Sequence, residues 1–574
     1  MPLKLTKCLK CNNCDVIHTS VVNDCFSSCP SDIQECAACI AVNKLKLEVE
    51  ETMERLKQLL QDLQQAKMEM NRRHSTIFKK LPVEIFHSIF ESYVSAPVSP
   101  RDKYGGNFDG SCRRKKMVRA TVLSQVCSHW RQVALATPRI WTTIALVWDE
   151  CAEEIDLVRE WFSRTRGFPL DVYMTTSYKK IRLENDGPEP FNGLQFMFYP
   201  FMEFMASTSA QWRYFTAYAP YCVLEKLGWH MKDLALLEEL NIQRVYGREV
   251  SERQIWDYCQ PAPKSIHLIA CRPNKMNIQW SAVTTMKVTY ITTEECITLL
   301  SSASNLITCI FEDIRRGDRE EGSWHIDRPA IKHEKIHNFT YDSDCSFIFY
   351  RLKLPNLRSF TGRLDNFSQN YEGFFKSMLD LKELSILSIS CNAETFQSVL
   401  SKVPGTVTRL SLTCEQNYRD REIDSRVEVM RVLDQALDVN TNTNANTDDL
   451  ILPNLTSLEI RADTYEFPWN YVPKCFGHIV GNIGERNGLR RRPLSRFRVT
   501  DETRDRYASD DNKGRHLIPA EVLTELVALQ RKGAEIMFQH KDGTDMLARS
   551  VQEPLYYIPP HRRTNTKSHH RKAS

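Results

Sequence analysis

The length, composition and charge of the chain limit what it can be. It has 574 residues, too many for one ordinary hydrophobic core, so we expect about two to four structural units. Apolar residues make up 42% and charged residues 26% of the chain, as in soluble globular proteins. The net charge of +4 creates no bulk field that would favour nucleic acid. The first residues do not have the pattern of a secretory leader, and no apolar run of about 18 residues occurs, so we expect a cytosolic or nuclear protein whose cysteines are mostly reduced thiols.

Residues 1–40 form a cysteine-rich segment with few large apolar side chains. Two Cys-x-x-Cys pairs, Cys8 with Cys11 and Cys36 with Cys39, have the spacing of structural zinc ligands. A zinc ion held by these four thiolates would fold a segment that is too short to hold a core. The alternative is a thiol-rich tail without metal, because the segment follows no standard zinc-finger pattern.

Residues 43–77 are predicted to form one long helix. Apolar side chains recur there at alternating steps of four and three with no intervening Gly or Pro, which is a coiled-coil heptad pattern. One core position of the heptad holds Val49, Leu56, Leu63 and Met70, and the other holds Leu45, Thr52, Leu59 and Ala66. Such a seam pairs either with a second copy of the chain or with another part of the same chain, and the sequence leaves both alternatives open.

Two short amphipathic segments follow within residues 78–175. Pro82 suits the first turn of a helix, where a missing N–H costs nothing, and Ile85 and Ile89 then fall on one face. The segment from Leu123 to Trp130 repeats this pattern. A helical hairpin this short cannot cover both of its apolar faces. The exposed face either binds a partner protein or packs on the part of the chain that follows.

These two segments resemble the F-box domain of fungal F-box proteins. That domain starts Leu-Pro-x-Glu-Ile and continues Leu-Ser-x-Val-Cys-x-x-Trp-Arg, and the chain has both patterns, at residues 81–85 and 123–131. The resemblance implies docking on a Skp-type adaptor and, through it, on a cullin–RING ubiquitin ligase. It assigns adaptor binding to seven positions: Leu81, Pro82, Ile85, Ile89, Leu123, Val126 and Trp130.

The chain departs from the F-box pattern in a long insertion at residues 95–120. Gly and Pro recur in its first half, and residues 101–120 carry seven Lys or Arg against two Asp. This composition predicts a basic surface loop between the two helices. Its length could hinder docking of the adaptor.

Residues 176–540 have the texture of an irregular leucine-rich-repeat region. Short apolar strands with period-two alternation recur after helical stretches. Strand centres are expected near residues 310, 339, 360, 388 and 411. Units of this kind stack into a solenoid because none of them can bury its own apolar edge. Residues 541–574 are charged and poor in apolar side chains, so we expect a disordered basic tail.

One short motif points to chemistry that its context does not support. Residues 333–337 match the zinc-protease pattern H-E-x-x-H, which requires a helix that turns both imidazoles toward one ion. The run continues directly into residues 338–342, which have a strand-like sequence. No phosphate-binding loop, dinucleotide loop or nucleophile elbow occurs. We therefore expect a protein without enzymatic activity.

The expected fold is α/β, with a long coiled-coil-type helix, a helical F-box and an irregular leucine-rich-repeat solenoid. The expected function is that of a substrate receptor, which brings a protein target close to the ligase without chemistry of its own. The rival hypothesis is a coiled-coil and repeat scaffold that joins no ligase. Nucleic-acid binding through the cysteine-rich segment and the basic runs is a third hypothesis, which the near-neutral net charge disfavours.

Overall fold

The computed structural model describes residues 5–7, 15–17, 37–74, 81–96, 111–147, 155–175, 195–231, 233–244, 254–315, 329–343, 345–363, 370–389, 393–414, 425–435, 451–462, 467–476, 492–501, 518–540 and 543–552. The chain divides into two compact units. The first comprises residues 1–93 and 120–137, and the second comprises residues 94–119 and 138–574.

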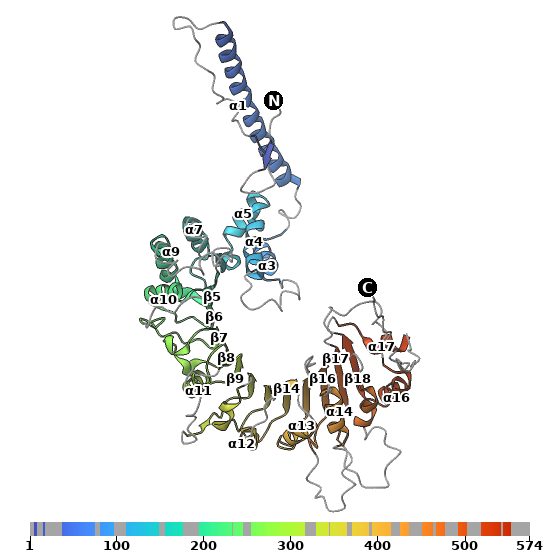
Figure 1. Ribbon diagram of the computed structural model, residues 1–574. Helices are drawn as coiled ribbons and strands as arrows, with labels where there is room; N and C mark the ends of the chain where they lie inside the picture. The colour runs from blue at the N-terminus through green and yellow to red at the C-terminus, as the bar shows by residue number, and fades with distance from the viewer. Residues whose placement is uncertain are drawn as a thin grey trace, which may run out of the picture. The chain divides into compact units, whose positions relative to one another are not determined.

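The first unit begins with a small hairpin and a long helix. Strand β1 (Leu5–Lys7) pairs antiparallel with β2 (Asp15–Ile17). Helix α1 (Ala37–His74) runs for 38 residues without a break (Figure 1), so it starts ahead of the boundary predicted at residue 43. Charged side chains recur along it and form pairs one turn apart, such as Arg73 with Glu69. None of the helices within the described ranges is long and apolar enough to span a membrane.

Parts of three shorter helices complete the first unit: α3 (Val83–Ser95), α4 (Ser111–Gln125) and α5 (Ser128–Leu135). Helix α4 corrects the prediction of a surface loop over residues 95–120, because the second half of that segment is helical. Arg, Lys, Met and Ala follow Gly110 with no further Gly or Pro, and these residue types favour a helix. Residues 97–110 lie outside the described ranges.

The second unit is built on one parallel sheet of 14 strands, arranged in chain order. These strands are β3 (Thr143–Val147), β4 (Leu170–Thr175), β5 (Trp212–Ala219), β6 (Glu239–Arg244), β7 (Ser265–Ile269), β8 (Thr285–Thr289), β9 (Thr308–Glu312), β11 (Asn338–Asp342), β13 (Ser359–Gly362), β14 (Glu383–Ile389), β15 (Arg409–Cys414), β16 (Ser457–Ala462), β17 (Arg496–Asp501) and β18 (Glu535–His540). Two further strands, β10 (Ile331–Lys332) and β12 (Leu352–Lys353), pair with each other.

Helices connect many of these strands. They are α7 (Ile155–Arg164), α9 (Gln195–Ser207), α10 (Tyr221–His230), α11 (Thr293–Ser302), α12 (Asn370–Lys376), α13 (Ala393–Leu400), α14 (Ser425–Gln435), α15 (Val472–Cys475), α16 (Ala520–Arg531) and α17 (Met546–Gln552). Short 3-10 turns are η3 (Pro138–Trp141), η4 (Ser209–Gln211), η5 (Pro273–Lys275), η6 (Trp280–Ala282), η7 (Phe347–Tyr350) and η9 (Trp469–Tyr471). Within this unit the strands follow the inner side of an arc, and helices α10 to α13 lie along its outer side (Figure 1).

The core of the second unit consists of columns of apolar side chains that run across the strands. Residues alternate along each strand, so that Cys309 and Phe311 of β9 are buried while Ile310 between them is only half-buried. The parallel register stacks one buried residue of each strand on the next, in the column Cys309, Phe339, Phe360, Leu384, Leu410, Leu458, Phe497 and Ile536. Each repeat therefore buries its apolar edge only against its neighbours, as in other solenoids.

The first repeat is closed by aromatic side chains. The indole N–H of Trp161 in α7 donates to the Trp141 carbonyl oxygen at 3.0 Å, and the two rings meet edge to face with centroids 4.8 Å apart. The Arg164 guanidinium lies 4.7 Å from the centre of the Trp141 ring, within cation–π range. These contacts supply the capping that the first unit of a stacked array needs.

The sheet confirms the strands predicted near residues 310, 339, 360, 388 and 411. It also extends ahead of residue 176, where the repeat region was predicted to start, because β3 and β4 pair with each other and β4 pairs with β5. The prediction of a disordered tail from residue 541 is wrong for α17. Met546 and Leu547 of this helix are buried, and the Ser550 hydroxyl accepts from the backbone N–H of Ile518 at 3.2 Å.

Candidate functional site

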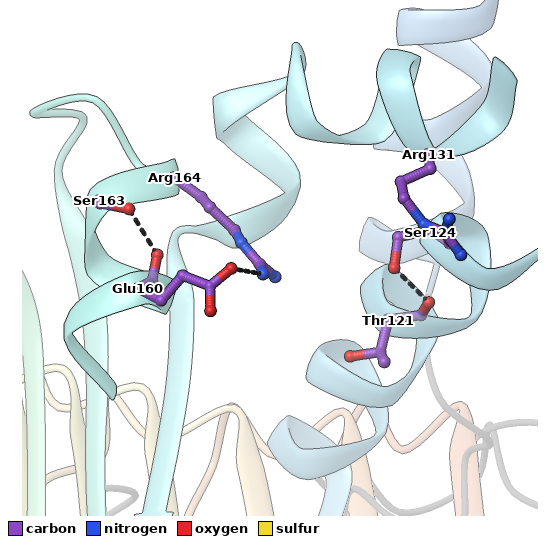
Figure 2. A network of polar contacts seen from close by, with 6 residues as sticks. All are labelled: Thr121, Ser124, Arg131, Glu160, Ser163 and Arg164. Atoms are coloured by element: carbon purple, nitrogen blue, oxygen red, sulfur yellow. Dashed lines mark hydrogen bonds and ion pairs between the residues drawn. The ribbon is translucent and has the colours of Figure 1, made fainter. Parts of the chain in front are cut away.

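The turn between α4 and α5 is fixed by polar residues of the F-box-like pattern. The Arg131 guanidinium donates through Nε to the Ser124 carbonyl oxygen at 2.9 Å, and the Ser124 hydroxyl donates to the Thr121 carbonyl oxygen at 2.7 Å (Figure 2). A positive charge at the end of α4 also suits the helix dipole. At the start of α5, the Cys127 sulfur accepts from the backbone N–H of Trp130 at 3.4 Å and acts as the helix cap.

The parts of α3, α4 and α5 that belong to the first unit carry buried apolar side chains. Phe86 and Phe90 of α3 are buried, as are Ala120 and Leu123 of α4 and Val133 and Ala134 of α5. The Phe90 ring lies 5.0 Å from the Trp130 ring, and the Phe86 ring lies 5.7 Å from the His129 ring. Edge and tilted ring contacts of this kind favour one specific packing. We call these helices the helical module.

The structure separates the seven predicted adaptor-binding residues into two groups. Leu123 is only 5% exposed and Trp130 is half-buried against Phe90, so both belong to the core of the helical module. The other five are exposed: Leu81, Pro82, Ile85, Ile89 and Val126. The amphipathic pattern identified an apolar face on each segment, but it could not show which of these side chains face inward.

The exposed apolar side chains form two stripes with a spacing of four residues. Leu81, just ahead of α3, and Ile85 and Ile89 of α3 are 37%, 44% and 46% exposed, and Tyr93 continues the same spacing. Val122 of α4 and Val126 directly after it form the second stripe. The sequence analysis missed Tyr93 and Val122, although the same spacing could have identified them. We call these two stripes the apolar stripes of the helical module.

The sheet of the second unit has a polar side opposite its buried side, which we call the open face. Oppositely charged side chains pair across neighbouring strands, as in Arg409 with Glu383 and Arg496 with Glu535, both at 2.6 Å. Lys287 pairs with Glu312 at 2.9 Å. Within each pair the two charges offset each other, and the polar side chains of this face are donors and acceptors for recognition.

The open face becomes more enclosed toward β6 and β7. Asn241 and His267 are aligned in register there, and His267 is aligned with Lys287 of β8. Asn241 donates to Glu239 at 2.7 Å and to the Thr216 hydroxyl at 3.3 Å. Burial, and secondly the charge of Lys287, lower the pKa of His267 to about 4. This row of the open face therefore carries a neutral imidazole at neutral pH.

The predicted metal ligands lie where the structure does not describe side chains. Cys8, Cys11 and Cys36 fall outside the described ranges, and Cys39 lies in α1 with its side chain undescribed. Within the described part of the chain, no cluster of His, Cys, Asp and Glu is placed to hold an ion. Structural zinc in residues 1–40 stays a prediction.

The H-E-x-x-H segment is not helical. Residues 333–337 form a bend between β10 and β11, as the strand-like sequence after them indicated. His333 is buried, and its Nε2 donates to the Ala303 carbonyl oxygen at 2.9 Å. The imidazole of His333 thus joins neighbouring repeats and is not presented to solvent.

These features define the class of the protein. A mixed α/β chain with one parallel sheet in chain order is a repeat protein, and its strand spacing and alternation fit a leucine-rich-repeat-like solenoid.

Comparison with known proteins adds little to this description. No protein-family profile and no curated protein matches the chain. Among solved structures, the chain is similar to the leucine-rich repeat-containing protein LegL7 from Legionella pneumophila, with 12% sequence identity and a TM-score of 0.28. The similarity covers 48% of this chain and 83% of that one. The description of a solenoid rests on strand order and register, and not on this similarity.

Proposed function

We propose that the chain is an F-box-type substrate receptor. In this proposal the helical module docks on a Skp-type adaptor of a cullin–RING ubiquitin ligase, and the open face of the sheet captures a protein target. The observation that carries the proposal is the pair of apolar stripes, which stay exposed although the helical module already closes a core on its other side. The match of residues 81–85 and 123–131 to the F-box pattern supports the same conclusion.

The apolar stripes have the chemistry of a protein-binding surface. Full burial of one large aliphatic side chain is worth about 1.5–3 kcal/mol, so a few such residues at the centre of an interface supply much of its binding energy. Ile85 and Ile89 lie on successive turns of α3, Leu81 precedes the helix at the same spacing, and the three side chains can enter one groove of a partner together. Contiguous exposed apolar side chains on a soluble protein commonly mark such a surface.

The chain's own contribution to ubiquitin transfer would be proximity. A target held on the receptor is present at a high effective concentration beside the ligase, and this speeds transfer without catalytic groups on the receptor. The open face suits target capture because side chains of many consecutive strands are displayed side by side. The chemistry of this face does not identify the target.

Binding of the full-length chain to a purified Skp-type adaptor tests the proposal. Replacement of Ile85 and Ile89 together by Arg should weaken binding by more than about a hundredfold, because two central apolar contacts are lost. Leu157 of α7 is also exposed, and Leu157→Arg serves as the matched control that should bind normally. Equal binding by the double variant and the control would rule out the apolar stripes as the docking surface.

The alternative function is a scaffold that joins no ligase. It is favoured by helix α1, whose heptad seam is exposed along its length, since a seam of this kind can assemble proteins without any adaptor. Affinity purification of the full-length chain from cells distinguishes the two functions. Recovery of adaptor and cullin supports the receptor, whereas recovery of other proteins without them supports the scaffold.

A further inference from the structure

We infer that two copies of the chain pair through α1 as a parallel, in-register coiled coil. This inference goes beyond the proposed function and does not depend on it. Its starting point is an unpartnered apolar seam on a helix of 38 residues. The side chains of the seam are exposed in the described part of the chain: Leu45, Val49, Thr52, Leu56, Leu59, Leu63, Ala66 and Met70.

An isolated helix with such a seam is not at its free-energy minimum in water. Most of the stability of a protein helix comes from packing of its apolar face, because helix propensity alone is marginal. A seam with a period of 3.5 residues is matched best by another seam of the same period, since both then stay in contact along a supercoil. A second copy of α1 provides that period and the same length.

The flanking charges select the parallel orientation. Val49, Leu56, Leu63 and Met70 occupy position a of the heptad. In a parallel pair, the residue at position g, just before a, contacts position e of the other helix, five residues further along the sequence. Asp62 then faces Lys67 of the second copy, and the symmetry of the pair repeats this contact. Asp62 already accepts from Gln58 of its own helix at 3.0 Å, and its second carboxylate oxygen remains for the lysine.

The other flanking positions of the parallel pair are compatible with it. Glu48 faces Met53 of the second copy, and Arg55 faces Leu60 of the second copy. The aliphatic stem of a charged side chain can cover an apolar neighbour while its charged end stays in water. Leu60 is exposed in the described structure, and the stem of Arg55 would shield it. No like charges meet at these positions.

Antiparallel pairing brings like charges together instead. In the register that places Leu56 against Leu59, Lys46 faces Lys67 and Glu48 faces Glu69, and only the contact of Arg55 with Asp62 joins opposite charges. When one helix is shifted by one heptad so that Leu56 lies against Thr52, Glu48 faces Asp62. In this register Arg55 faces Arg55 of the second copy. Sliding one heptad the other way sets Asp62 against Asp62 and Arg55 against Glu69, and this register is disfavoured mainly because it shortens the overlap of the apolar seams. Repulsion of this kind is what decides orientation when the apolar seams are equivalent.

Sedimentation of the full-length chain tests the pairing itself. The wild type should sediment as a dimer at micromolar concentration, and replacement of Leu56 and Leu63 by Lys should give a monomer. Leu47 lies on the opposite face of α1 and is exposed, so Leu47→Lys is the matched control that should stay dimeric. Circular dichroism of the Leu47→Lys control should match the wild type, whereas the double variant should lose part of its helical signal, because α1 loses the packing of its apolar face. A monomeric wild type, or a trimer, would overturn the inference.

A charge reversal tests the orientation. Lys67→Asp places a carboxylate against Asp62 of the second copy in the parallel pair and should raise the dimer dissociation constant by about tenfold. In the fully overlapping antiparallel pair, the same variant would replace the repulsion with Lys46 by attraction and so would lower that constant. Asp62→Lys should also weaken the parallel dimer. An equimolar mixture of Asp62→Lys and Lys67→Asp chains should restore it, because in the mixed dimer both contacts between positions 62 and 67 join a lysine to a carboxylate.

Discussion

The ring of Trp130 packs on the ring of Phe90 at 5.0 Å between centroids and joins α5 to α3. This contact forms part of the inner side of the helical module. Ile89, the direct neighbour of Phe90 in the sequence, is exposed. Adjacent residues of one helix thus divide the two tasks, since Phe90 holds the module together and Ile89 is free to bind.

This division predicts opposite effects for two neighbouring substitutions. Phe90→Ala removes a fully buried ring and should destabilise the helical module by about 3–5 kcal/mol. Ile89→Ala should change its stability by less than about 0.5 kcal/mol, because the side chain is exposed. Hydrogen exchange of the α3 and α5 amides in the full-length chain measures both effects. Similar protection of these amides in the two variants would contradict the assignment of inner and outer sides.

The same pair of residues shows what the sequence could predict. The spacing of Ile85 and Ile89 identified an apolar face, and the structure exposes it. The sequence could not show that Trp130 and Leu123 face inward, because both sides of such short helices are apolar and only their packing distinguishes them. In α4, the Gly and Pro residues before Ser111 suggested a loop and hid the helix that follows.

Along the sheet, the sequence identified strands where alternation is strong, as in β14 and β15. It missed β8, whose residues 285–289 read Thr-Met-Lys-Val-Thr. Its apolar residues are only Met286 and Val288, so the run does not stand out by itself, and the parallel register with neighbours on both sides defines it as a strand. The extent of the solenoid therefore depends on stacking between repeats, which local patterns do not show.

Gly228 of α10 should tolerate no side chain. A Cβ atom there would lie 2.9 Å from the backbone nitrogen of Trp256, which cannot move aside as the tip of a side chain could. Gly228→Ala should therefore destabilise the second unit by about 1–3 kcal/mol. At Gly373 of α12, a Cβ atom would have no neighbour within 4 Å, so Gly373→Ala should stabilise by up to about 1 kcal/mol.

Urea unfolding of the two glycine variants and the wild type measures these changes. The signs matter more than the sizes, because both substitutions add one methyl group within a helix. A stabilised Gly228→Ala variant would show that α10 does not pack closely on the backbone at Trp256.

Cys296 and Cys309 should resist alkylation in the folded chain. Both are fully buried, and burial raises the pKa of each thiol well above its ordinary value. The thiolate is the reactive form, so low access and low ionisation act together. Iodoacetamide labelling followed by peptide mass spectrometry should modify half-buried Cys127 at least roughly tenfold faster than either residue. In urea all three should react alike, and early labelling of Cys296 in the native chain would contradict the packing of α11.

His267 predicts a loss of stability in mild acid. Its pKa is lowered to about 4 in the folded chain from an ordinary value of 6.5, by burial and then by Lys287. Between these two values the unfolded chain binds a proton that the folded chain does not, so folding loses stability as the pH falls from about 6.5 to about 4.

At pH 5 the different proton binding of His267 in the folded and unfolded chain would by itself lower the free energy of unfolding by about 2 kcal/mol. Screening by solvent at the open face reduces the expected loss to about 1 kcal/mol. Above pH 6.5 the imidazole is neutral in both states, and no contribution remains.

Urea unfolding of the wild type and of His267→Gln at pH 7 and pH 5 isolates this contribution of His267, because Gln does not titrate. The wild type should lose about 1 kcal/mol more than the variant between the two pH values. An equal loss in both chains would mean that His267 is protonated in the folded state and that the row between Asn241 and Lys287 admits a charge.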